Sequence, residues 1–145
     1  MRIRPYTDAD WPEWLRMSVA LFYEHTAAEL EPDMRAFRAR SDANVFVAER
    51  DDGSVAGFVE VGSRPYADGC HTSPVGYIEA WYVDHDVRRH GFGRALLGAA
   101  EAWARTLGYR EMASDASLDN TESHLAHNRS GYQEVDRVVQ FRKLL

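Results

Sequence analysis

The hydrophobic positions of this chain switch repeatedly between the period of a strand and the period of a helix. Residues 2–6 read as a short first strand. Thr7-Asp8-Ala9-Asp10 then has capping-box spacing, and Pro12 falls in a first helical turn, where its missing N–H costs little. The apolar residues that follow at helical spacing are Trp11, Leu15, Val19 and Phe22. This pattern predicts a strand followed by a helix.

The middle of the chain predicts a second helix and a β-hairpin. The helix is expected to follow Pro32 and to end near Arg40. Strand-like runs at 44–49 and 55–61 flank Asp51-Asp52-Gly53, which is a strong turn signal. The loop at 63–74 contains two prolines and a glycine, and it is long enough to carry function.

The second half predicts further strands and helices in alternation. A strand at 77–83 leads into a helix that runs to Leu107, with Gly108 where a helix-terminating glycine is expected. The remaining expected elements are a strand at 110–114, a loop at 115–120, a helix at 121–130, and strands at 133–136 and 138–143. The order β-α-α-β-β-β-α-β-α-β-β predicts an α+β fold with a mixed sheet. Without a linker or repeat, residues 1–145 are expected to form a single domain.

Composition limits the partners of the chain. The 17 Lys and Arg against 23 Asp and Glu give a net charge of −6, which disfavours nucleic acid and suits a cationic partner. No apolar run approaches the ~20 residues of a membrane span, and no hydrophobic stretch follows the basic N-terminus. We therefore expect no membrane partner and no secretory signal. Cys70, the single cysteine, fits a half-buried thiol in a reducing cytoplasm.

The most informative segment joins the strand at 77–83 to the next helix. It reads Arg88-Arg89-His90-Gly91-Phe92-Gly93, and Arg94 follows directly. The two glycines allow a sharp turn and leave the backbone open to a ligand. The N–H groups that begin a helix are unpaired and lie at the positive end of its dipole. These features predict a pyrophosphate site. The P-loop motif and the first glycine of the dinucleotide motif are both missing.

The spacing R-x-x-G-x-G resembles the acyl-CoA loop of the GNAT N-acetyltransferase superfamily. A second motif of that superfamily, N-x-x-[AS]-x-x-x-Y-x-x-x-G-[FY], is matched by Asn120, Ser123, Gly131 and Tyr132, whereas His127 replaces the usual tyrosine. The predicted element order is also that of the GNAT fold. That fold is a mixed, mostly antiparallel sheet flanked by helices, with a cleft between two splayed central strands.

The resemblance implies acetyl-CoA as the acetyl donor and assigns its contacts. The strand at 77–83 would bulge and splay from its neighbour, so that the pantetheine arm pairs with its backbone. Asn120 would start the following helix and reach the same arm. The implied cofactor-binding residues are Trp81, Tyr82, Val83, Arg88, Arg89, His90, Gly91, Phe92, Gly93, Arg94 and Asn120.

Over nearly the whole chain, and most specifically at 109–143, the sequence looks very like the bacterial aminoglycoside 6′-N-acetyltransferases. This resemblance implies acetyl transfer to the 6′-amine of a cationic aminoglycoside, which confers antibiotic resistance. It also implies a homodimer, with exchange of the C-terminal strands between the two subunits as an open alternative. The substrate-binding residues carried over from the family are Phe22, Tyr66, Glu79, Asp115 and Asp136. Close members often carry tryptophan at the first position and glutamate at the last, which leaves the drug spectrum open.

Acetyl transfer requires a neutral amine, so a carboxylate must accept a proton from the substrate ammonium. Asp115 is the first choice for this base and Glu79 the second, although each has the alternative role of anchoring ammonium groups. A backbone N–H near Tyr82 or Val83 would polarise the thioester carbonyl. His127 is a candidate hydrogen-bond donor or acid toward the leaving sulfur, and a structural role on its helix face is an equal alternative.

Several alternatives stay open at this point. His124 and His127 lie three residues apart, but no third ligand has a fitting spacing, so we expect no metal. Direct transfer in a ternary complex is favoured over a route through Cys70. A polyamine or other small-amine N-acetyltransferase would use the same acids. A non-catalytic acyl-CoA-binding sensor would need the loop at Arg88 but no acids for an acceptor.

Overall fold

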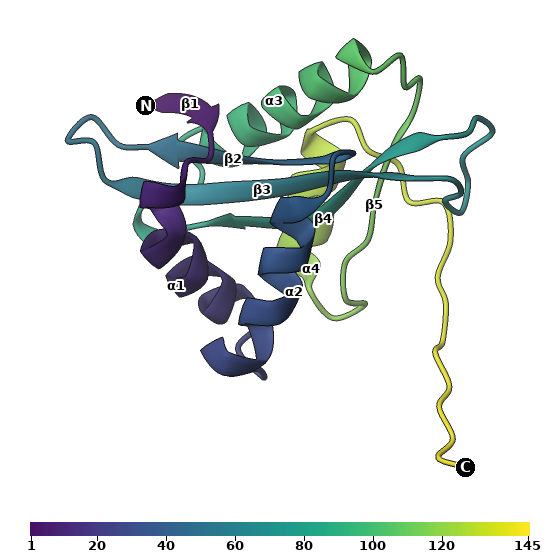
Figure 1. Cartoon of the computed structure of the whole chain (residues 1–145). Coiled ribbons are helices and arrows are strands. Elements are labelled where there is room, and N and C mark those ends of the chain that lie inside the picture. The colour runs from purple at the N-terminus through teal and green to yellow at the C-terminus, as the bar shows by residue number, and fades with distance from the viewer.

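The computed structural model describes residues 1–145 and places one five-stranded sheet between helices (Figure 1). The strands are β1 (Arg2–Pro5), β2 (Ala43–Glu49), β3 (Val55–Arg64), β4 (Val75–Val83) and β5 (Met112–Ser114). They lie in chain order; β1 to β4 are antiparallel, and β5 is parallel to β4. The helices are α1 (Trp11–Leu21), α2 (Ala27–Ala39), α3 (Phe92–Thr106) and α4 (Thr121–Arg129). The predicted α+β class with a mixed, mostly antiparallel sheet is confirmed.

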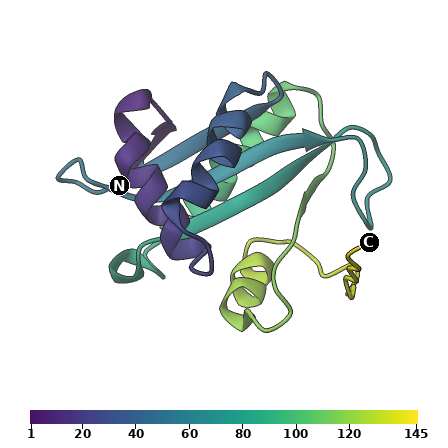
Figure 2. The same cartoon turned by 60° about the horizontal axis from the view of Figure 1, so that its bottom comes forward.

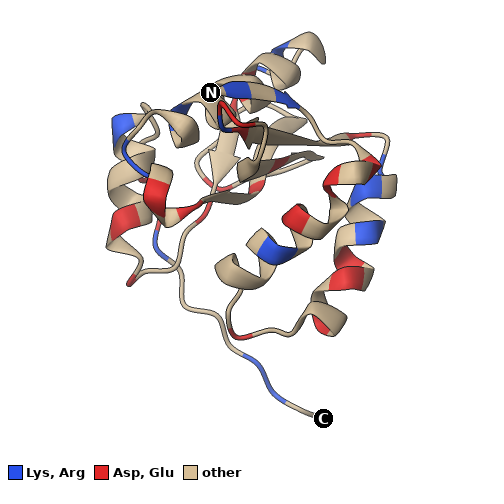
Figure 3. Cartoon of the chain, turned by 90° about the vertical axis from the view of Figure 1, so that its left-hand side faces the viewer, with Lys and Arg blue, Asp and Glu red and all other residues tan.

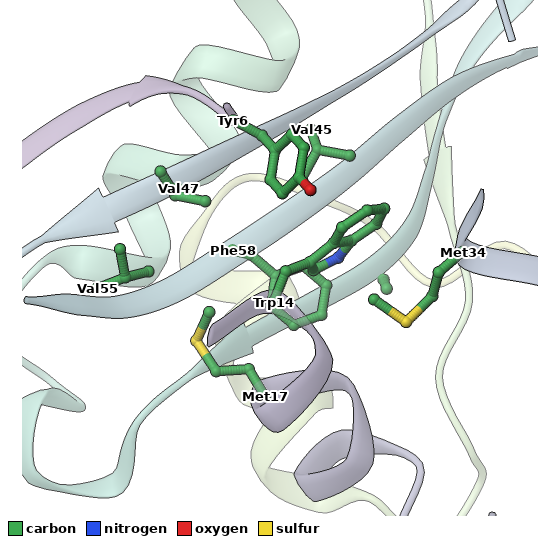
Figure 4. Packing of buried hydrophobic residues seen from close by; sticks show 9 residues of the cluster. Tyr6, Trp14, Met17, Met34, Val45, Val47, Val55 and Phe58 are labelled. Carbon is green, nitrogen blue, oxygen red and sulfur yellow. The ribbon is translucent and has the colours of Figure 1, made fainter. Parts of the chain in front are cut away.

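Helices cover both faces of the sheet. Helices α1 and α2 lie side by side on one face, and α3 packs on the other (Figure 2). On the first face, Trp14, Met17 and Phe58 are 0% exposed at the centre of the core (Figure 4). On the second face, Leu96 and Leu97 of α3 are buried against the sheet. Truncating such a side chain to alanine costs about 2–5 kcal/mol, so these two layers fix the position of β4.

Strand β4 contains the bulge that the family resemblance implies. Glu60 pairs with Ala80 while the next residue, Val61, pairs with Ile78, so Glu79 is an extra residue without a partner on β3. On its other side, β4 pairs with β5 only from Gly76 to Ile78. The backbone of 79–83 therefore has no neighbouring strand on that side, and β4 and β5 splay apart where the bulge lies.

The second helix begins earlier than predicted. Helix α2 starts at Ala27, five residues before Pro32, and Pro32 lies inside it. Thr26 caps the helix: its hydroxyl accepts from the Glu29 N–H at 3.3 Å, and the Glu29 carboxylate accepts from the Thr26 N–H at 3.4 Å. Pro32 removes only the one hydrogen bond that its N–H would make, which the capping box and tertiary packing outweigh. The overlooked signal is Thr26-x-x-Glu29.

The two C-terminal strands predicted at 133–136 and 138–143 are wrong for the single chain. Residues 132–145 form neither helix nor strand, and the segment runs away from the body (Figure 1). Val135, Val139 and Phe141 are 62%, 77% and 92% exposed. A strand needs a neighbour for its backbone N–H and C=O groups, and this segment has none. Consequently β5 is an edge strand, and the splayed pair is not central as predicted. No helix is both long and apolar enough to cross a bilayer.

Candidate active site

The start of α3 has the geometry of an anion site. Gly91 is the N-cap residue with a φ of 87°, and the first helical hydrogen bond runs from the Ala95 N–H to the Gly91 carbonyl at 3.0 Å. The amides of 91–94 precede that bond, so they are free at the positive end of the dipole. An open pocket of about 380 Å³ adjoins them, and its lining residues are His85, Asp86, Arg88, Arg89, His90 and Glu122.

The charged residues of this loop differ in their contacts. Arg88 is tied down, because its Nε donates to the Val83 carbonyl at 3.0 Å and its Nη1 to Glu122 at 3.2 Å. Arg89, His90 and Arg94 are exposed. Arg89 also has a φ of 62°, a left-handed conformation that costs a non-glycine residue about 1–2 kcal/mol. The contacts of the neighbouring Arg88 hold the loop in this tight turn in front of α3.

The two remaining loop residues serve the packing of α3. Phe92 is 8% exposed in the core between α3 and the sheet, so only its backbone faces the loop. A Cβ at Gly93 would lie 3.0 Å from the Trp81 ring, and glycine therefore permits this close approach. The indole N–H of Trp81 is buried and has no hydrogen-bond partner. This unpaired donor comes from the part of β4 that has no neighbouring strand, and it packs against the start of α3.

These features fit the acyl-CoA carrier that the sequence implies. The unpaired edge of β4 includes the backbone of Trp81, Tyr82 and Val83, all three of which were predicted to bind the pantetheine arm. Asn120 is the N-cap of α4, and its side-chain oxygen accepts from the Ser123 N–H at 3.1 Å. Its side-chain NH₂ remains available for a ligand.

On the opposite side of the bulge, the predicted acids form a connected group. Arg64 donates to Glu79 through two bonds, Nε–Oε1 at 2.8 Å and Nη2–Oε2 at 2.7 Å. The Arg64 guanidinium also lies 3.5 Å from the ring centroid of Tyr77. The Tyr77 hydroxyl in turn donates to Asp115 at 2.5 Å. Burial first, and this bond second, raise the pKa of Tyr77. Glu79 and Asp115 thus belong to one contact network despite their separation in sequence.

The other three predicted residues lie around this network. Phe22, directly after α1, lines the same groove as Glu79. Tyr66 is 68% exposed, and its hydroxyl donates to Asp68 at 2.9 Å. Asp136 lies in the C-terminal segment, where it accepts from the Arg137 N–H. A Cβ at Gly69 would lie 2.6 Å from Val135, so the C-terminal segment passes closely against the loop after β3. The hydrogen bonds of Tyr66 and Asp136 go to Asp68 and Arg137, not to Glu79 or Asp115.

Sequence reasoning missed one acid at the floor of the groove, Glu60. The groove has a volume of about 580 Å³ and runs between α1, α2 and β3. Burial raises the pKa of Glu60 to about 7, although a 3.1 Å hydrogen bond from the Trp14 indole N–H opposes this, and Glu79 adds to the rise. A glutamate within an otherwise apolar strand was the available signal. The charged residues of the whole chain are spread over many elements, as Figure 3 shows, so charge alone did not single it out.

His127 connects α4 to the sheet. Its Nδ1 lies 2.7 Å from the Ser123 carbonyl, which can only accept, so Nδ1 carries the hydrogen. Nε2 lies 2.8 Å from the Ser114 hydroxyl, which therefore donates to it. The ring also packs edge-on against Trp81 and Tyr132. Both ring nitrogens are thus engaged, and a neutral His127 has no hydrogen left to donate to a ligand.

Cys70 has the properties of an unreactive thiol. Burial, together with the nearby negative charge of Glu111, raises its pKa. The Glu111 carboxylate itself accepts from the N–H groups of His71 and Thr72, which keeps it in this position. A thiol that resists ionisation is a poor nucleophile at neutral pH.

The fold, the anion site before α3 and the network of Glu79 and Asp115 together define the class of protein. Residues 7–132 match the Acetyltransferase (GNAT) family, and the chain belongs to that family. The bulged β4, implied by the resemblance, and the anion site before α3, predicted from the loop residues, agree with this membership.

Relatives within the family are aminoglycoside-modifying enzymes. The chain is 40% identical to "Aminoglycoside N(6')-acetyltransferase type 1" of Klebsiella aerogenes over 99% of its own length and 96% of that protein. For the protein of the same name from Stenotrophomonas maltophilia, the identity is 39% over 97% and 91%. The crystal structure of the aminoglycoside antibiotic 6'-N-acetyltransferase from Acinetobacter haemolyticus superposes with a TM-score of 0.92, at 35% identity and with 100% and 99% coverage. AAC(6')-Iy in complex with the bisubstrate analogue CoA-S-monomethyl-acetylneamine has a TM-score of 0.91, at 30% identity and with 99% and 98% coverage.

Proposed function

We propose that this protein transfers the acetyl group of acetyl-CoA to the 6′-amine of aminoglycoside antibiotics. One observation carries the proposal: the bulge in β4 sets an anion-binding helix start on one side of a free strand edge and a group of carboxylates on the other. An acyl-CoA needs the first, and a polycationic acceptor needs the second. The full-length similarity to aminoglycoside 6′-N-acetyltransferases supports the same activity.

Acetyl-CoA supplies an electrophilic thioester carbon to this site. In the transfer, the amine nitrogen bonds to the acetyl carbon, the carbon–sulfur bond breaks, and the amine loses one proton. We assign that proton to Asp115, directly or through water, because Asp115 is exposed and accepts only the Tyr77 hydroxyl. Glu79, already paired with Arg64, is better suited to bind an ammonium group than to remove its proton.

Two requirements remain: a polarised thioester carbonyl and a proton for the leaving thiolate. An N–H of the free edge near Tyr82 or Val83 polarises the thioester carbonyl as charge develops on its oxygen. The leaving thiolate takes up a proton to give the free thiol. His127 supplies it only in its doubly protonated form, because its single hydrogen is bonded to the Ser123 carbonyl in the neutral form. We therefore assign His127 first to positioning α4 against Trp81.

Thiol release tests the activity. Kanamycin A and tobramycin, which carry a 6′-amine, should release free thiol from acetyl-CoA rapidly, as followed with a thiol reagent. A close analogue with a 6′-hydroxyl should give almost no release but should inhibit competitively, since its other ammonium groups still bind the acids. Equal rates on both compounds would contradict the 6′ position. A kcat/KM for spermidine above that for kanamycin A would favour a polyamine acetyltransferase. Tight acetyl-CoA binding without turnover would favour a sensor.

We also infer a homodimer whose C-terminal segments pair with the partner. The support is the unpaired edge of β5 together with an apolar segment in which Val139 and Phe141 are 77% and 92% exposed. Light scattering should give twice the mass of 16.5 kDa for the wild type. The full-length variant Val139→Asp/Phe141→Asp should be monomeric; a monomeric wild type would contradict the assembly. We place the enzyme in the cytoplasm, where acetyl-CoA and a reducing environment for Cys70 are found.

A further inference from the structure

Two residues of α1 and the residue that directly follows this helix lie along the groove between α1, α2 and β3. Trp14 and Ser18 are four residues apart and lie on the same side of the helix, and Phe22 follows at the helix end. Trp14 is fully buried and donates its indole N–H to Glu60 at 3.1 Å, and Phe22 lies at the open end of the groove. Ser18 lies between them and lines the groove.

Ser18 has an unmet hydrogen-bonding requirement. The residue is only 1% exposed, and its hydroxyl oxygen has no hydrogen-bond partner. A buried hydroxyl without a partner is unfavourable, and an alanine at this position of a helix would avoid the problem. The hydroxyl is therefore suited to a group that enters the groove from outside.

Glu60 likewise has spare capacity at the groove floor. Its carboxylate accepts one hydrogen bond, from Trp14, although two oxygens provide about four acceptor positions. The charged residues that line the groove from the surrounding elements are His25, Glu29, Asp33, Arg40, Arg64 and Glu79. Both arginines are paired elsewhere: Arg40 binds Asp42 at 2.9 Å, and Arg64 binds Glu79 at 2.7 Å. Glu60 is thus a half-buried acid without a cationic partner, since the two arginines of the groove bind other acids.

We propose that Glu60 and Ser18 form a binding site for an ammonium group of the acceptor, deeper in the groove than Glu79. The inference rests on the proposed function and names a contact of the same acceptor. An ammonium donates three hydrogen bonds, and this floor offers a free carboxylate oxygen of Glu60 and the Ser18 hydroxyl oxygen. The amine bound here is not the one acetylated, because acetylation at the free edge of β4 requires a second amine of the same molecule near Glu79 and Asp115.

The site has a measurable consequence for protons. With a pKa of about 7, Glu60 is partly protonated in the empty groove below neutral pH. An ammonium favours the carboxylate, so Glu60 gives up its proton to solvent when the acceptor binds. Affinity for the acceptor therefore falls as the pH drops below about 7, and binding below that pH releases a proton.

Calorimetry of kanamycin A binding to the CoA-loaded protein tests this assignment. The titrations are made just below neutral pH in two buffers of different ionisation enthalpy, which reports the protons released. Glu60→Gln should weaken binding about 10- to 100-fold and abolish the Glu60-dependent proton release, while acetyl-CoA binding stays unchanged. Glutamine still accepts from Trp14, so the fold is kept. Glu31→Gln removes an equal charge from α2 outside the groove and should resemble the wild type.

Ser18→Ala provides a second variant that separates ligand binding from folding. Its melting temperature without ligand should equal or exceed that of the wild type, since an unpaired buried hydroxyl is removed, yet kanamycin A should bind several-fold more weakly. Wild-type affinity and proton release in Glu60→Gln would overturn the inference, even if the enzyme acetylates kanamycin A normally. A wild type that neither binds nor acetylates any aminoglycoside would instead overturn the proposed function and the inference with it.

Discussion

Arg64 holds Glu79 in a two-bond ion pair at the bulge of β4, with nitrogen–oxygen distances of 2.8 and 2.7 Å. Without a ligand, the acid that the resemblance assigns to the acceptor is therefore already neutralised by the protein. The Glu79 side chain is 21% exposed, so an entering ammonium can share the carboxylate with Arg64. Arg64 sets the orientation of Glu79, but it is also a positive charge next to a polycation.

This relationship predicts non-additive mutations. Glu79→Gln should raise the KM for the aminoglycoside by more than 10-fold, because it removes a charge-assisted bond and leaves Arg64 unpaired in the groove. Arg64→Gln in the same molecule should recover part of that loss, because it removes the unpaired cation. Steady-state kinetics on both single variants and the double variant measure the coupling. A double variant worse than the sum of the two singles would show that Arg64 assists binding independently of Glu79.

The start of α3 predicts a specific loss of cofactor binding. Gly91 and Gly108 have φ values of 87° and 79°, and each has open space where a side chain would stand. Valine at either position should therefore destabilise the fold by a similar amount, about 1–2 kcal/mol. Only Gly91→Val places a side chain in front of the free N–H groups, so only it should weaken acetyl-CoA binding, by 10-fold or more. Calorimetry with Gly108→Val as the matched control decides; equal affinities would place the pyrophosphate elsewhere.

The role of Asp115 as a base predicts a mutation that lowers kcat and leaves the affinity for acetyl-CoA nearly unchanged. Asp115→Asn should lower kcat much more than it changes the affinity for acetyl-CoA, because it removes a proton acceptor and leaves the start of α3 intact. Tyr77→Phe keeps the carboxylate but removes its hydroxyl partner, so it should lower kcat by a smaller factor. Steady-state and single-turnover kinetics on the two variants provide the measurement. A near-normal kcat for Asp115→Asn would leave Asp115 as an anchor only.

Glu60 predicts that the stability of the fold decreases from acid to neutral pH. Its pKa is 4.5 ordinarily and about 7 in the folded protein, so the native state binds more protons than the unfolded state between these values. The contribution of Glu60 to the free energy of unfolding therefore falls as the pH rises from about 4.5 to 7, by up to about 3 kcal/mol. Glu60→Gln should be close to the wild type at the acid end of this window and more stable above it. Urea unfolding of both proteins across that range gives the difference; parallel pH profiles would contradict the assignment.

Local patterns were sufficient for much of the fold. The turn at Gly91 and the helix after it depend on neighbouring residues only, and the structure has both. The same holds for Asn120 at the start of α4. Helix α2 was misplaced because Pro32 was taken for its start, although Thr26 and Glu29 carried the stronger signal. The C-terminal strands failed for another reason: their apolar alternation is typical of a strand, but no strand of the chain pairs with residues 132–145.

The site was less predictable where it depends on contacts across the sheet. Glu60 lies 46 residues from Trp14, and nothing near it in sequence shows that the two meet. The pairing of Glu79 with Arg64 depends on the bulge at Glu79. The sequence of β4 reads as a regular strand, so the bulge could not be located from the sequence. The roles of Asp115 and Glu79 came from family resemblance, whereas their link through Tyr77 and Arg64 required the structure.

The bulge places Glu79, a residue assigned to the reaction, outside the regular pairing of β3 and β4. Because Glu79 has no partner on β3, a chain shortened by that one residue would pair β3 and β4 as an uninterrupted ladder, with Ile78 and Ala80 becoming adjacent. In that register Trp81 and Tyr82 would stay on their present faces of the sheet. We therefore expect the sheet to form without Glu79, whereas the acceptor site needs its carboxylate. A one-residue deletion should thus yield a well-folded protein that has lost its acceptor.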